Sequence, residues 1–182
     1  DYLWTSVSDS LRRRRERSLY LRSNPSLQGE ELIRCENDVI HFLSSWGWTY
    51  DPRETELRTL PFDPFPRQQE FLRFLQEREA TQSSGLVEKS REMGVSWLCV
   101  AYAVHSWLFR KGTAIGFGSH KKQDVDALGD LSTLLEKARF LLRHLPPWML
   151  PSNYVEREHA LFCRVINPDN GSVLTGEGGD NI

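Results

Sequence analysis

The fold prediction starts from nine residues, Lys89-Ser90-Arg91-Glu92-Met93-Gly94-Val95-Ser96-Trp97. The apolar pair Leu86-Val87 precedes them, and apolar residues then recur at helical spacing over 97–108. We therefore predict a strand, a glycine turn and a helix. Because the first N–H groups of a helix have no partner within it, they attract anions, and this order of elements predicts a phosphate-binding loop.

The stretch matches the standard phosphate-loop pattern, G-x-x-x-x-G-K-[ST], only in part. Gly94 and Ser96 fit, but Lys89 stands in place of the first glycine and Val95 in place of the lysine. The chemistry still requires a cation near the β- and γ-phosphates. Lys89 and Arg91 each supply one from the strand side of the loop, and which of the two replaces the lysine stays open.

In this interpretation backbone N–H groups hold the phosphates, Gly94 allows close approach of the backbone, and the Ser96 hydroxyl binds Mg²⁺. The phosphate-holding residues are Glu92, Met93, Gly94, Val95 and Ser96. The alternative is an ordinary strand-to-helix turn in which Ser96 caps the helix. The pattern alone favours the ordinary turn.

A wider resemblance favours the phosphate loop. Residues 89–97 resemble the deviant Walker A loop of the large terminase subunit of tailed bacteriophages, several members of which also lack the lysine and carry a basic residue at the front of the loop. Three further stretches resemble that family: WTYDPR at 48–53, PFPRQQEFL at 64–72 and GSVLTGEGGDN at 171–181. Their order and spacing carry the resemblance, which covers about residue 48 to the C-terminus.

The resemblance implies an α/β fold, a P-loop NTPase-type parallel sheet with flanking helices, and the ligands ATP and Mg²⁺. It also implies that a glutamine before the loop reads the adenine edge, because an amide offers both a donor and an acceptor. Gln68 fits this role best by its spacing to Phe71-Leu72, and Gln69 is the second choice. A surface glutamine without a ligand is the alternative for both.

The function implied by the resemblance is that of a viral DNA-packaging ATPase, which couples ATP hydrolysis to translocation of double-stranded DNA into the procapsid. The implied partners are double-stranded DNA, the portal protein, the small terminase subunit and further copies of the chain in a ring. The implied location is the bacterial host cytoplasm, at the procapsid.

Two regions are expected: a helical N-terminal region at 1–60 and the N-terminal part of a P-loop ATPase domain at 61–182, joined by the proline-rich connector 60–66. No apolar strand runs into Asp or Glu, so the Walker B acid is expected beyond this sequence, as is the nuclease domain of the family. The resemblance implies that the intact protein is an ATPase, whereas residues 1–182 alone are predicted to bind nucleotide weakly or not at all and to turn over no ATP.

Periodicity and turn residues predict the remaining elements. They are a helix over 28–45, a packed strap over 46–53, a helix over 68–80, a strand over 113–118, a helix over 123–144, and a β-hairpin of 161–166 and 172–174 around the turn 167–171. His120, which follows the strand 113–118, is expected to cap or solvate that turn rather than bind a ligand.

Composition indicates a globular domain, with 39% hydrophobic and 26% charged residues among 182. No apolar run is long enough to span a membrane and no signal peptide is evident, so an intracellular protein is expected. The net charge of −2 means that any contact with DNA is local. Cys35, Cys99 and Cys163 are isolated from one another, which predicts buried thiols with neither zinc nor disulfides.

A basic run, Arg12 to Arg15 with Arg17, lies in a predicted first helix. The preferred interpretation of this run is a solvated helix face, and the alternative is a contact with DNA phosphates. Two rival functions stay open: a non-enzymatic module that binds DNA or a partner through this run, and a helicase-like P-loop ATPase. Loss of DNA binding when these arginines are neutralised, with no effect on nucleotide binding, would favour the first. The sequence downstream of Ile182 would distinguish a helicase-like ATPase from a terminase, because a terminase is expected to continue into a nuclease domain.

Overall fold

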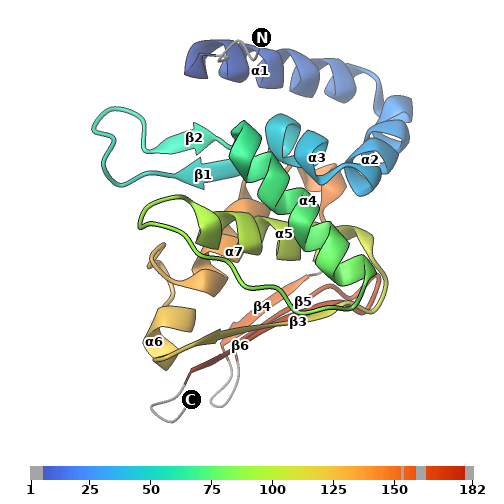
Figure 1. Cartoon of the computed structure of the whole chain (residues 1–182). Helices are drawn as coiled ribbons and strands as arrows, with labels where there is room; N and C mark the ends of the chain where they lie inside the picture. Colours follow the sequence, from blue (N-terminus) through green and yellow to red (C-terminus); the bar gives the residue numbers. More distant parts are fainter. Residues whose placement is uncertain (1–5, 153, 159–162, 179–182) are drawn as a thin grey trace.

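A computed structural model describes residues 6–152, 154–158 and 163–178 (Figure 1). The fold is mixed α/β, with helices layered on one face of a small sheet. The helices are α1 (Val7–Ser23), η1 (Pro25–Leu27), α2 (Gln28–Asn37), α3 (Val39–Trp46), α4 (Pro66–Ala80), α5 (Val95–Phe109), α6 (Lys122–Val125), α7 (Leu134–Arg143) and η2 (Pro147–Met149). The strands are β1 (Trp48–Tyr50), β2 (Thr59–Pro61), β3 (Ala114–Ser119), β4 (Val155–Glu158), β5 (Cys163–Ile166) and β6 (Val173–Gly178).

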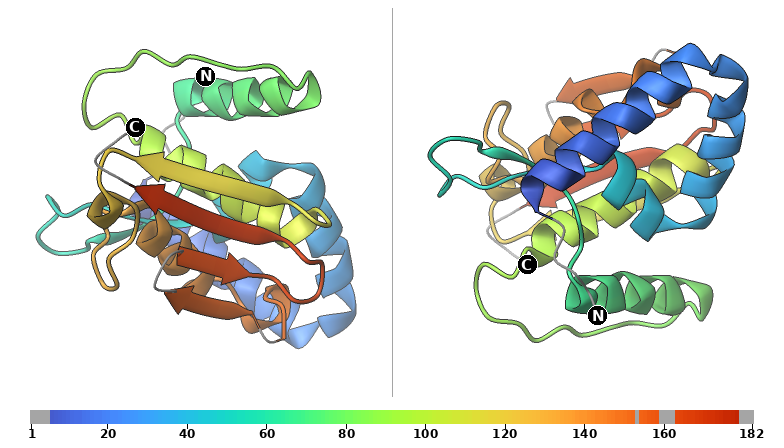
Figure 2. Two further views of the ribbon diagram at one scale, coloured as in Figure 1. Left: turned by 90° about the horizontal axis from the view of Figure 1, so that it is seen from below. Right: turned by 90° about the horizontal axis from the view of Figure 1, so that it is seen from above.

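The main sheet has the strand order β3-β6-β5-β4, which Figure 2 (left) shows from below. Strands β3 and β6 are parallel, whereas β5 is antiparallel to both of its neighbours. The predicted strand 113–118 and the hairpin around 167–171 are confirmed, although 161–162 and 179–181 lie outside the described residues. The sheet is therefore mixed, where a parallel sheet was expected.

Helix α5 occupies the centre of the molecule. It is apolar around most of its circumference and buried from Val100 to Trp107, as expected for a helix covered on all sides. The Trp107 indole N–H donates to the carbonyl of Val165 on β5, 3.0 Å away, and joins the helix to the sheet. On the other side Phe42 of α3 packs edge-on against Phe109. One hydrophobic core thus extends from α1 to β6.

The predicted helix over 28–45 is two helices, α2 and α3. Asp38 is extended, and its carboxylate accepts hydrogen bonds from the backbone N–H groups of Ile40 and His41, at 2.8 and 3.0 Å. An Asp in this position starts a new helix rather than continuing the old one. The segment predicted as a strap and the following connector contain β1 and β2, an antiparallel pair in which Trp48 lies opposite Pro61.

The predicted helix over 68–80 is confirmed as α4, but the helix over 123–144 is wrong. The chain forms the short helix α6, turns through Asp126 to Thr133, and then forms α7. Asp126 leaves the helical conformation, and its carboxylate pairs with the buried Arg139 guanidinium, at 2.7 Å from one of its nitrogens. This tertiary ion pair outweighs the helical periodicity of the sequence.

The strand predicted at Leu86-Val87 is also wrong. Residues 83–90 have no regular structure, and Leu86 is 97% exposed. The segment instead passes beside α4, where the Gly85 backbone lies so close to Phe74 that a Cβ would be 2.6 Å from its ring. It leads directly into α5 (Figure 1).

Candidate functional site

The glycine turn and the helix start predicted at Gly94 are confirmed. Gly94 has φ of +73° and is the N-cap of α5, with no side chain capping the helix. The first N–H bonded within the helix is that of Leu98, which donates to the Gly94 carbonyl at 3.0 Å. The N–H groups of 95–97 therefore point out of an uncapped helix start. Ser96 is exposed in the first turn and does not cap the helix.

Gln68 lies at this turn. Its side-chain N–H donates to the carbonyl of Met93, 3.3 Å away, and its side-chain oxygen accepts the Phe65 backbone N–H at 3.0 Å. Gln69 donates instead to the carbonyl of Pro64, at 3.0 Å, in the chain that leads into α4. The structure thus places the first choice of the sequence prediction beside Gly94, and the second choice elsewhere.

Lys89 and Arg91 lie in the exposed part of the loop, and no ion pair is found for either within the described residues. Glu92 has the left-handed φ of +64°, and its carboxylate pairs with Arg53 at 2.9 Å. Arg53 comes from the loop between β1 and β2, so four segments meet here: that loop, the start of α4, residues 89–94 and the start of α5. His120 is exposed at the end of β3.

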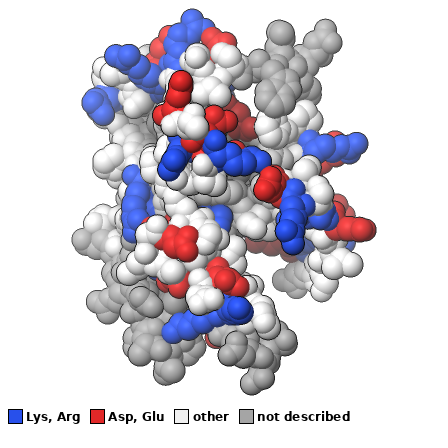
Figure 3. All heavy atoms as spheres, turned by 90° about the vertical axis from the view of Figure 1, so that its left-hand side faces the viewer, with Lys and Arg blue, Asp and Glu red and all other residues white. Residues whose placement is uncertain are grey.

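The surface around the loop carries charges of both signs. In Figure 3, which looks at the left-hand side of Figure 1, Lys and Arg side chains are interspersed with Asp and Glu side chains. They form no continuous basic area over the described part of this face. Any cationic contribution to an anion site on this face therefore comes from individual side chains.

The basic run of α1 is only partly a solvated face. Arg14 is 7% exposed, and its guanidinium donates to the carbonyls of Gly47 and Leu43, at 2.6 and 3.0 Å, at the end of α3. It also stacks over the ring of Trp48. Arg14 is therefore a structural residue, whereas Arg12, Arg13 and Arg15 are exposed as predicted. Residue type alone does not distinguish the buried Arg14 from the exposed arginines on either side of it.

A second cluster joins α1, α2 and α3. The ligand-type atoms of Glu31, Cys35 and His41 lie within 4.8 Å of one another, a grouping compatible in principle with a metal ion. However, the Glu31 Oε1 atom already accepts hydrogen bonds from Trp46 Nε1 at 2.8 Å and from Arg17 at 2.9 Å. Burial raises the pKa of the Cys35 thiol to about 12, which disfavours the thiolate that binds metals. Arg17 supplies the cation of this cluster.

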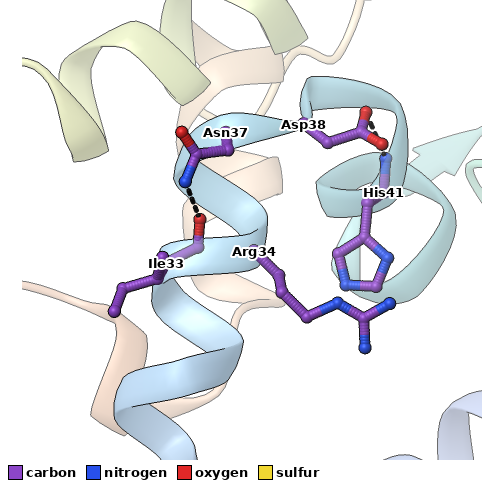
Figure 4. Close-up of a pocket in the computed structure, with 5 residues that line it drawn as sticks. All are labelled: Ile33, Arg34, Asn37, Asp38 and His41. Atoms are coloured by element: carbon purple, nitrogen blue, oxygen red, sulfur yellow. Dashed lines mark hydrogen bonds between the residues drawn. The ribbon is translucent and has the colours of Figure 1, made fainter.

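A shallow depression adjoins this cluster at the junction of α2 and α3 (Figure 4). It is lined by Ile33, Arg34, Asn37, Asp38 and His41. The Asn37 amide donates to the Ile33 carbonyl, and the Asp38 carboxylate caps α3. Because these polar groups serve the helix ends, they do not converge on a ligand.

Replacing Glu31 by Gln is expected to lower the free energy of unfolding at pH 7 by about 1 to 3 kcal/mol, because charge-assisted hydrogen bonds are lost. Burial alone would raise the pKa of Glu31, but the Trp46 hydrogen bond and Arg17 outweigh it, and the pKa lies below its ordinary value. The stabilisation is therefore present above the unfolded pKa, about 4.3, and is lost as the pH falls through the folded pKa.

Urea unfolding at pH 7 and pH 3 measures this effect. The difference between wild type and Glu31→Gln should shrink at the lower pH, and the exposed neighbour substitution Glu30→Gln serves as the control. An equal difference at both pH values would contradict the assigned role of the Glu31 charge.

The cysteines agree with the sequence prediction in part. Cys35 is buried, Cys99 is half-buried, and both are free thiols. The side chain of Cys163 lies outside the described residues. No helix among the described residues is long and apolar enough to cross a membrane.

No family model matched the chain, and no curated protein matched it. Evidence for a function therefore comes from the residues themselves and from the four short stretches that resemble the terminase family.

Proposed function

We propose that the chain is the ATP-binding part of a DNA-packaging motor of the large terminase type, with the nucleotide phosphates at the loop 89–96. The contact between Gln68 and the Met93 carbonyl carries this proposal. The residue that the resemblance assigns to adenine and the loop that it assigns to phosphate lie together, although 25 positions separate Gln68 from Met93 in the chain.

The residues at the loop fit a nucleotide with its magnesium ion. The uncapped start of α5 offers N–H groups to phosphate oxygens, and the left-handed Gly94 brings the backbone close to them. The exposed Ser96 hydroxyl suits a Mg²⁺ ligand, and Lys89 and Arg91 offer cations without internal competition among the described residues. Gln68 would exchange its bond to Met93 for the adenine edge.

The role in DNA packaging rests on the resemblance of the four sequence stretches. In that role the chain would act with double-stranded DNA, a portal protein, a small terminase subunit and further copies of itself, in the host cytoplasm. We expect residues 1–182 to bind nucleotide without sustained hydrolysis, because no apolar run of the sequence leads into the carboxylate that would complete the Mg²⁺ site.

Calorimetric titration with Mg²⁺ and a non-hydrolysable ATP analogue tests the proposal. Binding by the wild type should weaken by about tenfold, or 1.4 kcal/mol, in Gln68→Ala, because one amide contact to adenine is lost. Ser96→Ala should weaken binding only when Mg²⁺ is present. The matched control is Gln69→Ala, whose amide faces Pro64.

Two results would contradict the proposal. One is the absence of nucleotide binding by the folded wild-type chain. The other is equal weakening by Gln68→Ala and Gln69→Ala, which would show that the two substitutions act through α4 and not through a contact with adenine.

A further inference from the structure

Arg53 is held in a fixed orientation in front of the loop. Its Nε and one terminal nitrogen donate to the two carboxylate oxygens of Asp51, at 2.9 and 2.7 Å. Asp51 also accepts the backbone N–H of Arg53, at 3.0 Å. This fork-to-carboxylate pairing fixes the plane of the guanidinium and leaves the remaining terminal nitrogen, Nη1, directed away from Asp51.

The partner of this remaining nitrogen is the Glu92 carboxylate, 2.9 Å away. Glu92 lies within the residues that we assign to phosphate binding, two positions before Gly94, and it has φ of +64°. A glutamate in the left-handed region is uncommon, because its Cβ crowds the backbone there. A carboxylate in such a loop also repels phosphate unless a cation holds it.

We propose that Arg53 is a phosphate ligand of the nucleotide site, supplied by the loop between β1 and β2, and that the Glu92 carboxylate occupies its place when no nucleotide is bound. This inference rests on the proposed function and extends it. It assigns to the site a residue 39 positions away in the sequence from the loop that it serves.

The chemistry favours this exchange. The Arg53 and Glu92 side chains are 65% and 72% exposed, so solvent screens their attraction and the pair opens readily. A triphosphate carries more charge than a carboxylate, and a guanidinium suits its oxygens in planar geometry. The Asp51 carboxylate holds the Arg53 guanidinium both with and without nucleotide. The guanidinium therefore keeps its orientation when the Glu92 carboxylate moves away.

The two members of the pair should therefore act on affinity in opposite directions. Titrations of the full chain with AMP, ADP and a non-hydrolysable ATP analogue, each with Mg²⁺, test this. Arg53→Ala should weaken binding of the ATP analogue by about tenfold or more and change AMP binding by less than about twofold. Glu92→Gln should strengthen binding of the ATP analogue by about threefold, because the competing carboxylate is gone.

Arg58→Ala is the matched control, since Arg58 lies in the same exposed loop and donates to the Glu54 carbonyl. It should leave all three affinities unchanged. Thermal unfolding of each variant without nucleotide verifies that the fold is retained.

The outcomes separate this inference from the proposed function. If Arg53→Ala and Glu92→Gln weaken binding equally, the pair is structural and the inference is wrong. If Arg53→Ala leaves ATP-analogue binding intact while Ser96→Ala weakens it, the inference is wrong and the nucleotide site stands. If the wild type binds none of the three nucleotides, both are wrong.

Discussion

Replacing Arg139 by Met is expected to lower the free energy of unfolding by about 3 to 5 kcal/mol, and the midpoint of thermal unfolding by roughly 10 °C. The Arg139 side chain is 0% exposed and pairs with the carboxylates of Asp126 and Glu136, which are almost fully buried. Burial by itself would lower the pKa of Arg139, but the two carboxylates outweigh it and raise the pKa. Removing the guanidinium leaves two buried anions without this cation.

Arg143→Met is the matched control for this prediction. Arg143 pairs with the same Glu136, but its side chain is 47% exposed, so its loss should cost no more than about 1 kcal/mol. Calorimetric or urea unfolding of both variants provides the comparison. Similar losses in the two variants would show that the Arg139 ion pairs do not hold the turn between α6 and α7 in place.

Replacing Gly94 by Val is expected to weaken nucleotide binding by at least about tenfold. A side chain at φ of +73° costs about 1 to 2 kcal/mol, and a β-branched side chain costs more. A Cβ at Gly94 would also lie 3.1 Å from the Gln68 side-chain nitrogen. The substitution therefore disturbs the phosphate loop and displaces the adenine-reading amide at once.

Gly112→Val is the control that separates backbone strain from damage to the nucleotide site. Gly112 has a similar φ of +68° at the opposite end of α5, and no atom lies within 4 Å of the position that its Cβ would take. Its replacement should cost similar stability and leave nucleotide affinity unchanged. If Gly112→Val weakens binding as much as Gly94→Val does, the loss reflects general destabilisation of α5 and not the loop.

The elements predicted correctly from the sequence are those determined by local interactions. Helix α4 begins at Pro66 and carries its apolar residues at helical spacing, and the β5–β6 hairpin has an Asn-Gly turn at 170–171. The turn at Gly94 also follows from local chemistry, because glycine accepts positive φ at little cost. No distant contact is needed to form any of these.

The break at Asp38 within the helix predicted over 28–45 is local, because its carboxylate caps Ile40 and His41. The other wrong predictions depend on partners outside the local sequence. Helical periodicity continues through Asp126, yet its pairing with Arg139 breaks the helix. The apolar pair Leu86-Val87 has no neighbouring strand to pair with among the described residues, and it remains irregular and exposed. Arg14 is indistinguishable by type from the exposed arginines beside it, although its carbonyl partners lie about 30 residues away.

The candidate site divides in the same way. The glycine loop at Gly94 is indicated by its own sequence pattern, and Gln68 by the family resemblance together with its spacing to Phe71-Leu72. The structure places Gln68 in contact with Met93 of the loop. Arg53 was not selected, because nothing in its own neighbourhood refers to the loop 39 positions later. The only sequence signal at Arg53 is its position in the stretch WTYDPR, one of the four that resemble the terminase family.

Backbone amide NMR shifts on titration with Mg²⁺ and a non-hydrolysable ATP analogue test the central claim most directly. We predict that the largest chemical-shift changes occur at the backbone amides of 93–97 and at the side-chain amide of Gln68. The shifts of the amides around His41 should remain unchanged. Shifts centred on the depression between α2 and α3, or no shifts at all in the folded chain, would contradict the assignment of the Gly94 loop as a nucleotide site.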